Sequence, residues 1–465
     1  MLPPLPRHPS LYQINARVWL NRLQGAPPGE GDLAAIPDAE LDRLADLGFD
    51  LIYLLGVWQT GERGRRVAAG FPGLTQEYRK ALPDFSDKDV CGSPFALAGY
   101  TVHRNLGGDA ALVSLRDRLH RRGLRLILDF VPNHTGLDHP WIGEHPDYYI
   151  RGTRENRARD PENWWSTHVD GEELILAHGR DPYYAGWTDT LQLDYGNPEL
   201  QSAMVDQLLR AAELCDGLRC DMAMLILPQV FQRTWGIEAD NFWPRAIGEA
   251  RARREFLFIA EAYWDLEWTM LRQGFDYAYD KRLYDRLSRG PAQAVRQHLQ
   301  AGVEFQSGLV RFLENHDEPR AATVFPGAQH GAAAALAYLS PGLRFFHNQQ
   351  EEGYRRRVPV QLCRGPQEPT DPAAATLYEE LFDLLRDPLF KQGEWELLPA
   401  DPAGPDVIAF RWSAPGDAQH KDRERLAVVN YSAQPARFHG GLDGQESLEL
   451  DLGPWDVRIL ENREL

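Results

Sequence analysis

Residues 125–134 have the sequence Arg-Leu-Ile-Leu-Asp-Phe-Val-Pro-Asn-His, and this stretch decides the fold. Its apolar part has the length of a buried strand, and polar residues follow directly where the strand would end. The pattern recurs as Gly-Leu-Arg-Cys-Asp at 217–221, as Phe-Leu-Phe-Ile-Ala-Glu at 256–261 and in a run from 309 that ends with Glu-Asn-His-Asp at 314–317. One acidic residue behind a strand means little, but four strand ends that carry carboxylates or His indicate one shared site.

Strand-like stretches alternate with helical ones along most of the chain, which is typical of a parallel sheet. Eight such strands can close into a (β/α)8 TIM barrel of the α/β class, whose reactive side chains stand at the carboxyl ends of the strands. The candidate strands are Tyr12–Leu20, Asp50–Gly56, Arg125–Val131, Gly217–Asp221, Glu255–Glu261, Phe275–Asp280, Leu309–Asp317 and Gly342–Asn348. The helical patterns between them include Asp38–Leu47, Ala110–Arg122, Pro198–Leu214 and Ala373–Arg386.

Two segments interrupt this alternation. Residues 135–190 follow the third strand and are rich in Trp, Tyr, Asp, Arg and Gly with little helical period, so we expect an inserted domain there. After about Leu389 the chain consists of short β-rich runs, one of them Glu446–Leu450, separated by Pro, Gly and Asp, as in a small antiparallel β-sandwich. The predicted organisation is a barrel of residues 1–134 and 191–388, an inserted domain of 135–190 and a C-terminal sandwich of 389–465.

Composition excludes several classes of partner. The 465-residue chain is 43% apolar and 25% charged, as in a globular protein with a sizeable core. Its formal net charge of −18 repels phosphate backbones and anionic lipid, so nucleic acid and membranes are poor candidates. No apolar run approaches the roughly 20 residues that cross a bilayer, and Met1–Ser10 lacks the apolar core of a signal peptide. We therefore expect a cytoplasmic protein whose four cysteines are buried free thiols.

Two carboxylates have sequence environments that suit opposite roles. Arg219 and Asp221 are two positions apart, so on a strand both side chains point the same way, and the guanidinium would keep Asp221 ionised as a nucleophile requires. Glu261 follows the apolar run Leu257–Ala260, and partial burial would favour its protonated form, as an acid requires. Such a pair can cleave a glycosidic bond with retention if the carboxyl groups lie about 5–5.5 Å apart.

The four motifs resemble the signature regions of the α-amylase family, glycoside hydrolase family 13. They stand in that family's order, from Asp-Phe-Val-Pro-Asn-His at 129–134 to Glu-Asn-His-Asp at 314–317, and the likeness extends to the insertion and the C-terminal β domain. Leu-Gln-Leu-Asp at 191–194 is loosely similar to a further motif near the end of the family's inserted domain. The resemblance implies a retaining enzyme that acts on α-linked sugars through a covalent glycosyl-enzyme.

The resemblance also implies catalytic roles. Asp221 is expected to be the nucleophile, Glu261 the general acid/base, and Asp317 the third carboxylate, which holds ring hydroxyls of a distorted sugar. Arg219 would orient Asp221. Asp129 is expected to support the site structurally.

A second group of residues resembles those that bind the sugar. His134 and His316 would hydrogen-bond hydroxyls of the sugar in the −1 subsite, and Tyr100 would be the aromatic ring on which that sugar stacks. The aromatic residues of the insertion either form further sugar platforms over the cleft or pack the insertion against the barrel; they are Trp164, Trp165, Tyr183, Tyr184 and Trp187.

The chain departs from the family pattern just after the nucleophile. Calcium-dependent amylases of the family carry a Lys-His pair there, which serves the acceptor sugar and the metal, whereas this chain has Met224 and Leu225. Although Asn133 remains, this change argues against a calcium site, and we expect no metal and no other cofactor.

Two further features have no assigned role. They are His103 and the run Arg355-Arg356-Arg357. An arginine run of this kind is usually a solvated loop; if it has a function, that function would be contact with a phosphorylated sugar or an acidic product.

Several functions remain open at this point. The leading one is a hydrolase of the amylase or α-glucosidase kind, with an oligosaccharide or disaccharide as substrate. The second is a transglycosylase of the same chemistry, such as a glucanotransferase, a trehalose-forming isomerase or a maltosyltransferase, and the apolar Met224 and Leu225 tilt slightly toward it. A non-catalytic sugar- or protein-binding barrel is disfavoured because all three carboxylates are present. A metal-dependent hydrolase is disfavoured because the chain has no HxH motif. Linkage preference, substrate length and oligomeric state are not encoded in any recognisable motif.

Overall fold

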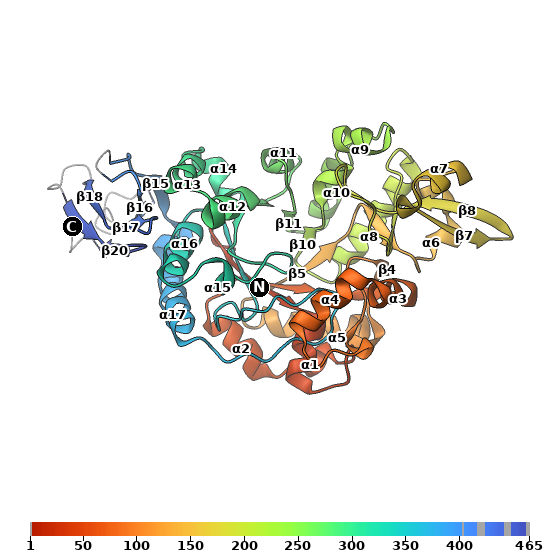
Figure 1. The fold of residues 1–465 in the computed structure, drawn as a ribbon, viewed down its shortest axis with the longest axis horizontal. Helices are drawn as coiled ribbons and strands as arrows, with labels where there is room; N and C mark the ends of the chain where they lie inside the picture. Colours follow the sequence, from red (N-terminus) through yellow and green to blue (C-terminus); the bar gives the residue numbers. More distant parts are fainter. Residues whose placement is uncertain (1, 402–403, 416–423, 441–447, 462–465) are drawn as a thin grey trace.

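Eight parallel strands close into a barrel in the computed structural model, which describes residues 2–401, 404–415, 424–440 and 448–461. The order around the barrel is β1-β14-β13-β12-β11-β10-β5-β2. The predicted TIM barrel is therefore confirmed, and Figure 1 shows it at the centre of the molecule with helices around it. The strands are β1 (Ser10–Asn15), β2 (Leu51–Leu55), β5 (Arg125–Phe130), β10 (Gly217–Cys220), β11 (Leu257–Ala260), β12 (Tyr277–Tyr279), β13 (Leu309–Arg311) and β14 (Leu343–His347).

Two of the predicted helices that cover the barrel start at capping residues. Asn197 caps α8 (Pro198–Ala212) by accepting the backbone N–H groups of Glu199 and Leu200, and proline occupies the first helical position. Asp371 caps α17 (Pro372–Arg386) in the same way. The other predicted helices are α2 (Asp38–Asp46) and α5 (Gly108–His120).

The first predicted strand was too long. Tyr12–Leu20 was expected to be extended, but β1 ends at Asn15, whose side chain accepts the N–H groups of Arg17 and Val18 and so starts α1 (Ala16–Gln24). The apolar residues after Asn15 therefore lie on one side of a helix instead of continuing a strand. The seventh strand also stops early, at Arg311, so the motif at 314–317 lies in a loop.

Four elements between β2 and α5 were not predicted. They are β3 (Trp58–Thr60), α3 (Glu62–Gly70), α4 (Pro72–Ala81) and β4 (Leu97–Val102), and β3 pairs with β4 in antiparallel fashion. The backbone of Gly136 passes β4 closely, because an added Cβ there would lie 2.5 Å from the carbonyl oxygen of Ala96. The segment just before β4 therefore lies directly against β6 (His134–Gly136), which follows the third barrel strand.

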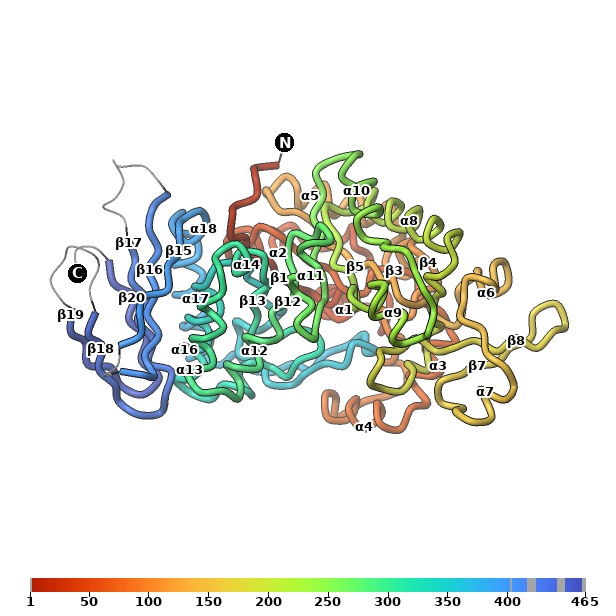
Figure 2. The backbone as a smooth tube through the Cα atoms, turned by 90° about the horizontal axis from the view of Figure 1, so that it is seen from above, coloured from red at the N-terminus to blue at the C-terminus, as the bar shows by residue number. Residues whose placement is uncertain are grey.

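The segment after the third barrel strand leaves and re-enters the barrel through a short antiparallel pair, β6 (His134–Gly136) with β9 (Thr190–Gln192). Between them the chain forms α6 (Trp141–Glu144), α7 (Arg154–Arg159) and a hairpin of β7 (Trp164–Val169) and β8 (Glu172–Ala177). Figure 2 shows this hairpin projecting at the end of the molecule opposite the C-terminal sheet.

The C-terminal part consists of two antiparallel sheets, which confirms the predicted sandwich. One has the order β15-β16-β17-β20, and the other pairs β18 with β19. Their facing apolar side chains, among them Val428 and Phe438, form one small cluster. The predicted strand at 446–450 begins outside the described residues. The strands are β15 (Glu394–Leu397), β16 (Val407–Ser413), β17 (Glu424–Asn430), β18 (Ala436–Gly440), β19 (Leu448–Leu452) and β20 (Val457–Glu461).

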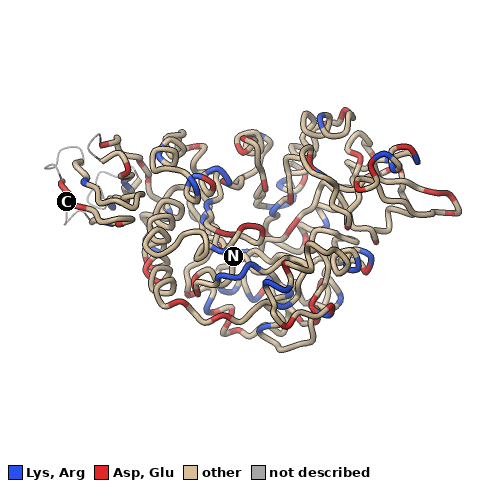
Figure 3. Tube along the Cα trace, viewed as in Figure 1, with Lys and Arg blue, Asp and Glu red and all other residues tan. Residues whose placement is uncertain are grey.

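Charged residues are spread over the described part of the molecule, and its four cysteines form no disulfides. Figure 3 shows acidic and basic residues interspersed along the described trace. All four cysteines are free, and all are buried except Cys91, which is partly exposed. Within the described ranges, no helix combines the length and the apolar character that a membrane crossing requires.

Barrel closure at β14 requires a glycine, which gives a first prediction. Gly342 has φ +121°, and an added Cβ would lie 2.2 Å from the carbonyl oxygen of Leu309. We expect Gly342→Ala to lower the melting temperature clearly, by a destabilisation of more than about 2 kcal/mol. The control is Gly248→Ala on the exposed face of α10 (Phe242–Arg253), where no atom lies within 4 Å of the new Cβ. That variant should melt at the same or a slightly higher temperature, and equal melting of both variants would contradict the argument.

Candidate active site

One buried guanidinium joins three carboxylates at the carboxyl ends of neighbouring strands. Arg219 on β10 is 1% exposed, and its Nη1 donates to Asp129 Oδ1 at 3.1 Å and to Asp221 Oδ1 at 2.8 Å. Its Nη2 donates to Glu261 Oε2 at 2.6 Å. Arg219 and Asp129 are register partners on adjacent strands, so both side chains enter the barrel at the same level. The structure thus brings together four of the residues singled out in the sequence.

The electrostatics of this cluster differ from the sequence interpretation. Burial raises the pKa of Asp221 well above its ordinary value; Arg219 opposes this, and the negative charges of Glu261 and Asp129 add to it. Burial likewise raises the pKa of Asp129, against Arg219 and the hydroxyl of Tyr53, which donates at 2.6 Å. Arg219 lowers the pKa of Asp221 as expected, but burial outweighs this effect, and the two neighbouring carboxylates add to the rise. One positive charge among three buried carboxylates favours retention of a proton within the cluster.

Glu261 is surrounded by hydrogen-bond donors. It is 3% exposed, as its apolar lead-in predicted, yet it accepts the backbone N–H of Met222 at 2.8 Å and the hydroxyl of Tyr263 at 2.7 Å besides Arg219. Met222 has φ +40°, a left-handed conformation that is costly for a residue with a side chain. The strained backbone directly after Asp221 therefore directs an N–H group at Glu261, which no sequence motif indicated.

The loop after β13 carries Asp317 and His316 to the site. His316 Nε2 lies 3.1 Å from Asp317 Oδ2, and the Asp317 side chain is half exposed. Gln13, fully buried on β1, places its amide nitrogen 2.8 Å from His316 Nδ1 and its amide oxygen 2.8 Å from His347 Nδ1. With the amide in this orientation, Nδ1 of His316 is the acceptor and Nε2 carries the proton, and this N–H is buried without a hydrogen-bond partner among the described residues. Sequence analysis identified neither Gln13 nor His347.

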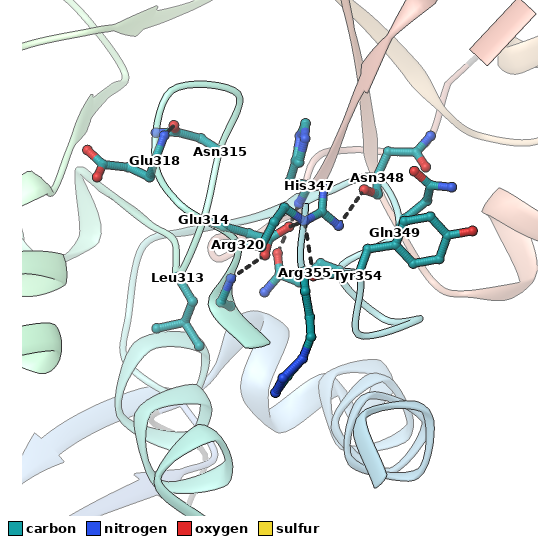
Figure 4. Close-up of polar contacts among 12 residues, drawn as sticks. Leu313, Glu314, Asn315, Glu318, Arg320, His347, Asn348, Gln349, Tyr354 and Arg355 are labelled. Atoms are coloured by element: carbon teal, nitrogen blue, oxygen red, sulfur yellow. Dashed lines mark hydrogen bonds and ion pairs between the residues drawn. The ribbon is translucent and has the colours of Figure 1, made fainter. Parts of the chain in front are cut away.

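A second buried ion pair anchors this loop. Glu314 and Arg320 lie 3.1 Å apart, and Arg320 also donates to the carbonyl oxygens of Asn348, at 3.0 Å, and Tyr354, at 3.4 Å (Figure 4). Burial raises the pKa of Glu314 to about 7, against the opposing effect of Arg320. Arg320 thus ties the loop to the chain after β14, and Glu314, the first residue of the Glu-Asn-His-Asp motif, holds Arg320 in place.

Phe95 occupies the centre of the site although it belongs to no motif. The guanidinium of Arg219 lies 5.3 Å from the centre of the Phe95 ring, and the ring of His316 lies 5.4 Å away. His134 hydrogen-bonds the backbone of Phe95, and burial lowers the pKa of His134 to about 3, so this histidine is neutral. Phe95 therefore connects the carboxylate cluster to both predicted sugar-binding histidines.

Tyr100 is packed among other side chains. It is 6% exposed, its hydroxyl donates to the carbonyl of Val131 at 3.1 Å, and the N–H of Val131 donates to that hydroxyl at 2.7 Å. Its ring stacks on Phe130 and meets Trp58 edge-on. This packing leaves little of the Tyr100 ring exposed, whereas Phe95 is the ring beside the carboxylates.

The remaining sequence candidates occupy varied positions. Trp187 packs against His134 with ring centres 5.2 Å apart, whereas Tyr183 and Tyr184 are 52% and 75% exposed. His103 starts a short 3-10 helix by accepting the N–H of Asn105, and burial lowers its pKa to about 4. Of the three consecutive arginines, Arg357 donates to the backbone carbonyl of Asp317 at 3.4 Å and so reaches the edge of the site.

The residues at the family's calcium position do not supply a donor set. The side-chain amides of Asn133 and Gln192 donate to each other's oxygens at 3.1 and 3.0 Å, which occupies both groups. Leu225 is buried and apolar. In the part of the chain that is described, no cluster of three or more His, Cys, Asp or Glu residues is arranged to hold a metal.

Comparison with known proteins gives one family match. The model of the α-amylase catalytic domain matches residues 17–270. A trehalose synthase/amylase of Mycobacterium tuberculosis is 28% identical over 250 residues, covering 50% of this chain and 35% of that protein. An oligo-1,6-glucosidase of Parageobacillus thermoglucosidasius is 25% identical over 229 residues, covering 46% of this chain and 34% of that protein. The matched part spans about a third of the length of these two relatives.

Solved structures resemble the whole described fold. An α-amylase from Lactobacillus plantarum has a TM-score of 0.71 at 21% identity and covers 98% of both chains. An isomaltulose synthase from Erwinia rhapontici NX5, solved with sucrose, has a TM-score of 0.70 at 16% identity and covers 99% of both. At this level of identity the likeness establishes the fold.

The shared guanidinium predicts a pH-dependent stability. Arg219→Met would leave three buried carboxylates without a cation, so we expect it to cost about 3–5 kcal/mol of unfolding free energy at pH 7.5. Burial already raises the folded-state pKa values of Asp221 and Asp129, and without the opposing effect of Arg219 they lie still further above the unfolded values. The folded state then binds more protons, and stability is lost as pH rises from 5 to 8.

Melting temperatures measured across that pH range test this prediction. The control is Arg245→Met on α10, whose side chain is 51% exposed and contacts Glu249 and Ser202. A loss of stability for Arg219→Met that is the same at every pH would contradict the electrostatic argument.

Proposed function

This chain belongs to the α-amylase family, and on that basis we propose that it hydrolyses α-glucosidic bonds of gluco-oligosaccharides through a covalent glycosyl-enzyme. The observation that carries the proposal is the pair of carboxyl oxygens, Asp221 Oδ1 and Glu261 Oε2, on the two terminal nitrogens of Arg219. Oxygens bound to one guanidinium cannot be far apart. This arrangement suits retaining chemistry, which needs carboxyl groups about 5–5.5 Å apart, better than inverting chemistry, which needs about 6.5–9.5 Å.

Asp221 would act as the nucleophile. Its oxygen bonds to the anomeric carbon while the bond to the leaving oxygen breaks, and Arg219 stabilises the ionised carboxylate from which the attack begins. Because the pKa of Asp221 is raised, its ionised form is unfavourable while the neighbouring carboxylates are also ionised. Transfer of a proton held elsewhere in the cluster to the leaving oxygen would occur as the negative charge of Asp221 is consumed by its bond to the anomeric carbon.

Glu261 would deliver that proton and later take one from the incoming hydroxyl. In the described geometry both of its oxygens are occupied by donors. Of the three donors, Arg219 is fixed by two other carboxylates and Met222 contributes backbone, whereas the Tyr263 hydroxyl stands on a side chain that can rotate. We infer that the leaving oxygen takes the place of the Tyr263 hydroxyl at Glu261 Oε1.

The sugar itself would be held by the residues around Phe95. The N–H of His316 Nε2 and the carboxylate of Asp317 can bind ring hydroxyls as donor and acceptor. Neutral His134 can donate or accept on the other side of Phe95. The Phe95 ring would face the apolar C–H surface of the sugar, the role that the family resemblance assigned to Tyr100.

The division of the chain follows from these roles. We propose a catalytic barrel of residues 1–134 and 191–388, an inserted domain of 135–190 that borders the cleft, and a C-terminal sandwich of 389–465. The inserted segment contributes Trp187, which packs on His134 and would help to position this sugar-binding histidine.

A transglycosylase is the second candidate, and one feature favours it. Met224 and Leu225 are buried and apolar just beyond Asp221, where the family's hydrolytic amylases have Lys and His. A drier acceptor side would disfavour water relative to a sugar hydroxyl as the group that intercepts the glycosyl-enzyme.

Replacing the nucleophile tests the mechanism. We expect Asp221→Asn to lower kcat/KM on 4-nitrophenyl α-glucoside by at least about 10³-fold. Its melting temperature should be unchanged or higher, because one buried negative charge is removed. The matched control is Asp206→Asn on the exposed face of α8, which should keep full activity. Undiminished turnover by Asp221→Asn would exclude the proposed nucleophile.

Product analysis separates hydrolysis from transfer. With maltotriose as the only substrate, hydrolysis yields glucose and maltose, whereas transfer also yields maltotetraose. We expect glucose and maltose to predominate, as measured by chromatography at early time points. Maltotetraose as a main product would contradict the hydrolytic proposal and favour the transglycosylase.

A further inference from the structure

Two arginines stack on aromatic rings where the inserted segment meets α9 (Pro228–Trp235). The guanidinium carbon of Arg180 lies 4.7 Å from the ring centre of Trp235, and that of Arg233 lies 5.0 Å from the ring centre of Tyr183. Tyr183 also contacts Trp264, with ring centres 5.0 Å apart. In Figure 1, α9 lies beside the inserted segment at one end of the molecule. We call these five residues the rim cluster.

The two guanidiniums of the rim cluster lack anionic partners. Neither Arg180 nor Arg233 forms an ion pair or a side-chain hydrogen bond with any residue in the described ranges, and Nε of Arg180 is buried without a partner. Arg180 is partly exposed and Arg233 is exposed, so a ligand from solvent can reach this cluster. Stacking on a ring holds a guanidinium by its face and leaves its N–H edge free to bind a planar oxyanion.

The rim cluster borders the side of the site from which a leaving group departs. Trp264 follows Tyr263, whose hydroxyl contacts Glu261, and Glu261 is the group proposed to protonate the leaving oxygen. Arg180 follows Gly179, at which an added Cβ would lie 2.9 Å from His134. The loop with Arg180 thus runs from a sugar-binding histidine toward the acid/base.

The backbone near Trp264 is strained. Trp264 and Asp265 both have φ +63°, in the left-handed region that costs residues with side chains about 1–3 kcal/mol each. Such conformations persist where the surroundings hold them, and the Trp264 ring contacts Tyr183 of the inserted segment.

We propose that Arg180 and Arg233 bind an oxyanion, a phosphate or a carboxylate, on the leaving group or acceptor of the glycosyl transfer. The inference rests on the proposed function, since it assigns the acceptor side of the same site. The net charge of −18 repels anions from the molecule as a whole, so a local pair of unpartnered cations must supply the attraction. The substrate class is then an α-glucoside of an acidic sugar or sugar phosphate.

Acceptor competition tests the proposal. The donor is 4-nitrophenyl α-glucoside, and the acceptors at equal concentration are glucose, glucose 6-phosphate and glucuronate. In the transfer step the ester bond to Asp221 breaks, the acceptor oxygen bonds to the anomeric carbon, and the acceptor's proton passes to Glu261. Transfer products are quantified by mass spectrometry as a ratio of anionic to neutral acceptor.

We expect that ratio to be at least about tenfold for the unaltered protein and to fall toward one in Arg180→Met and Arg233→Met. The control Arg245→Met removes an exposed arginine on α10 and should keep the ratio. Arg180→Lys retains the positive charge but not the planar guanidinium, so the ratio should fall only in part. Glucose 6-phosphate and glucuronate in separate reactions show which oxyanion is preferred. A ratio near one for the unaltered protein, or one unchanged in both methionine variants, overturns the proposal.

A binding measurement tests the oxyanion site even if the protein has no glycosidase activity. If no nitrophenol is released from 4-nitrophenyl α-glucoside, that result contradicts the proposed function and leaves the oxyanion site to be decided by binding. Calorimetric titration with glucose 6-phosphate and with glucose then decides the inference. Binding of the phosphate at least about tenfold tighter than glucose, and weakened by Arg180→Met, supports it. Equal binding of both sugars, or equal affinity in the variant, contradicts it.

Discussion

The Arg219 guanidinium, buried among Asp129, Asp221 and Glu261, is the interaction on which the rest of the site depends. A buried charge is tolerated only when it is paired and hydrogen-bonded, and here one cation must serve three anions. The surplus of negative charge explains why further donors, such as the Tyr53 hydroxyl, converge on the same carboxylates. It also couples their protonation, so that a proton leaving one carboxyl changes the others.

The barrel makes this concentration of charge possible. Parallel strands β5, β10 and β11 are neighbours, so their carboxyl ends deliver side chains to one level without any long-range adjustment. The loop with Asp317 is less constrained by the strand that precedes it, and the separate ion pair of Glu314 with Arg320 fixes it instead (Figure 4). The Arg219 cluster and the Glu314–Arg320 pair thus lie at the same end of the barrel, at the carboxyl ends of β10 and β13.

The unpredicted residues have a common physical cause. Phe95 and Gln13 contact the site from segments far away in sequence, and neither belongs to a motif or a periodic pattern. Tyr263 and Met222 are close to motif residues, but whether they donate to Glu261 depends on backbone conformation. Tyr100 shows the converse, because its motif was visible while its burial depends on packing against other segments.

The sequence by itself determined the barrel, its sandwich and the set of carboxylates at the strand ends, because strand periodicity and motif order are local properties. Only the tertiary structure decided how those carboxylates share charge. Arg219 is two positions from Asp221, which suggested an exclusive pair, but strand neighbours bring Asp129 and Glu261 equally close. The pKa of a buried group is set by everything that surrounds it in space, and proximity in space is what a linear pattern does not contain.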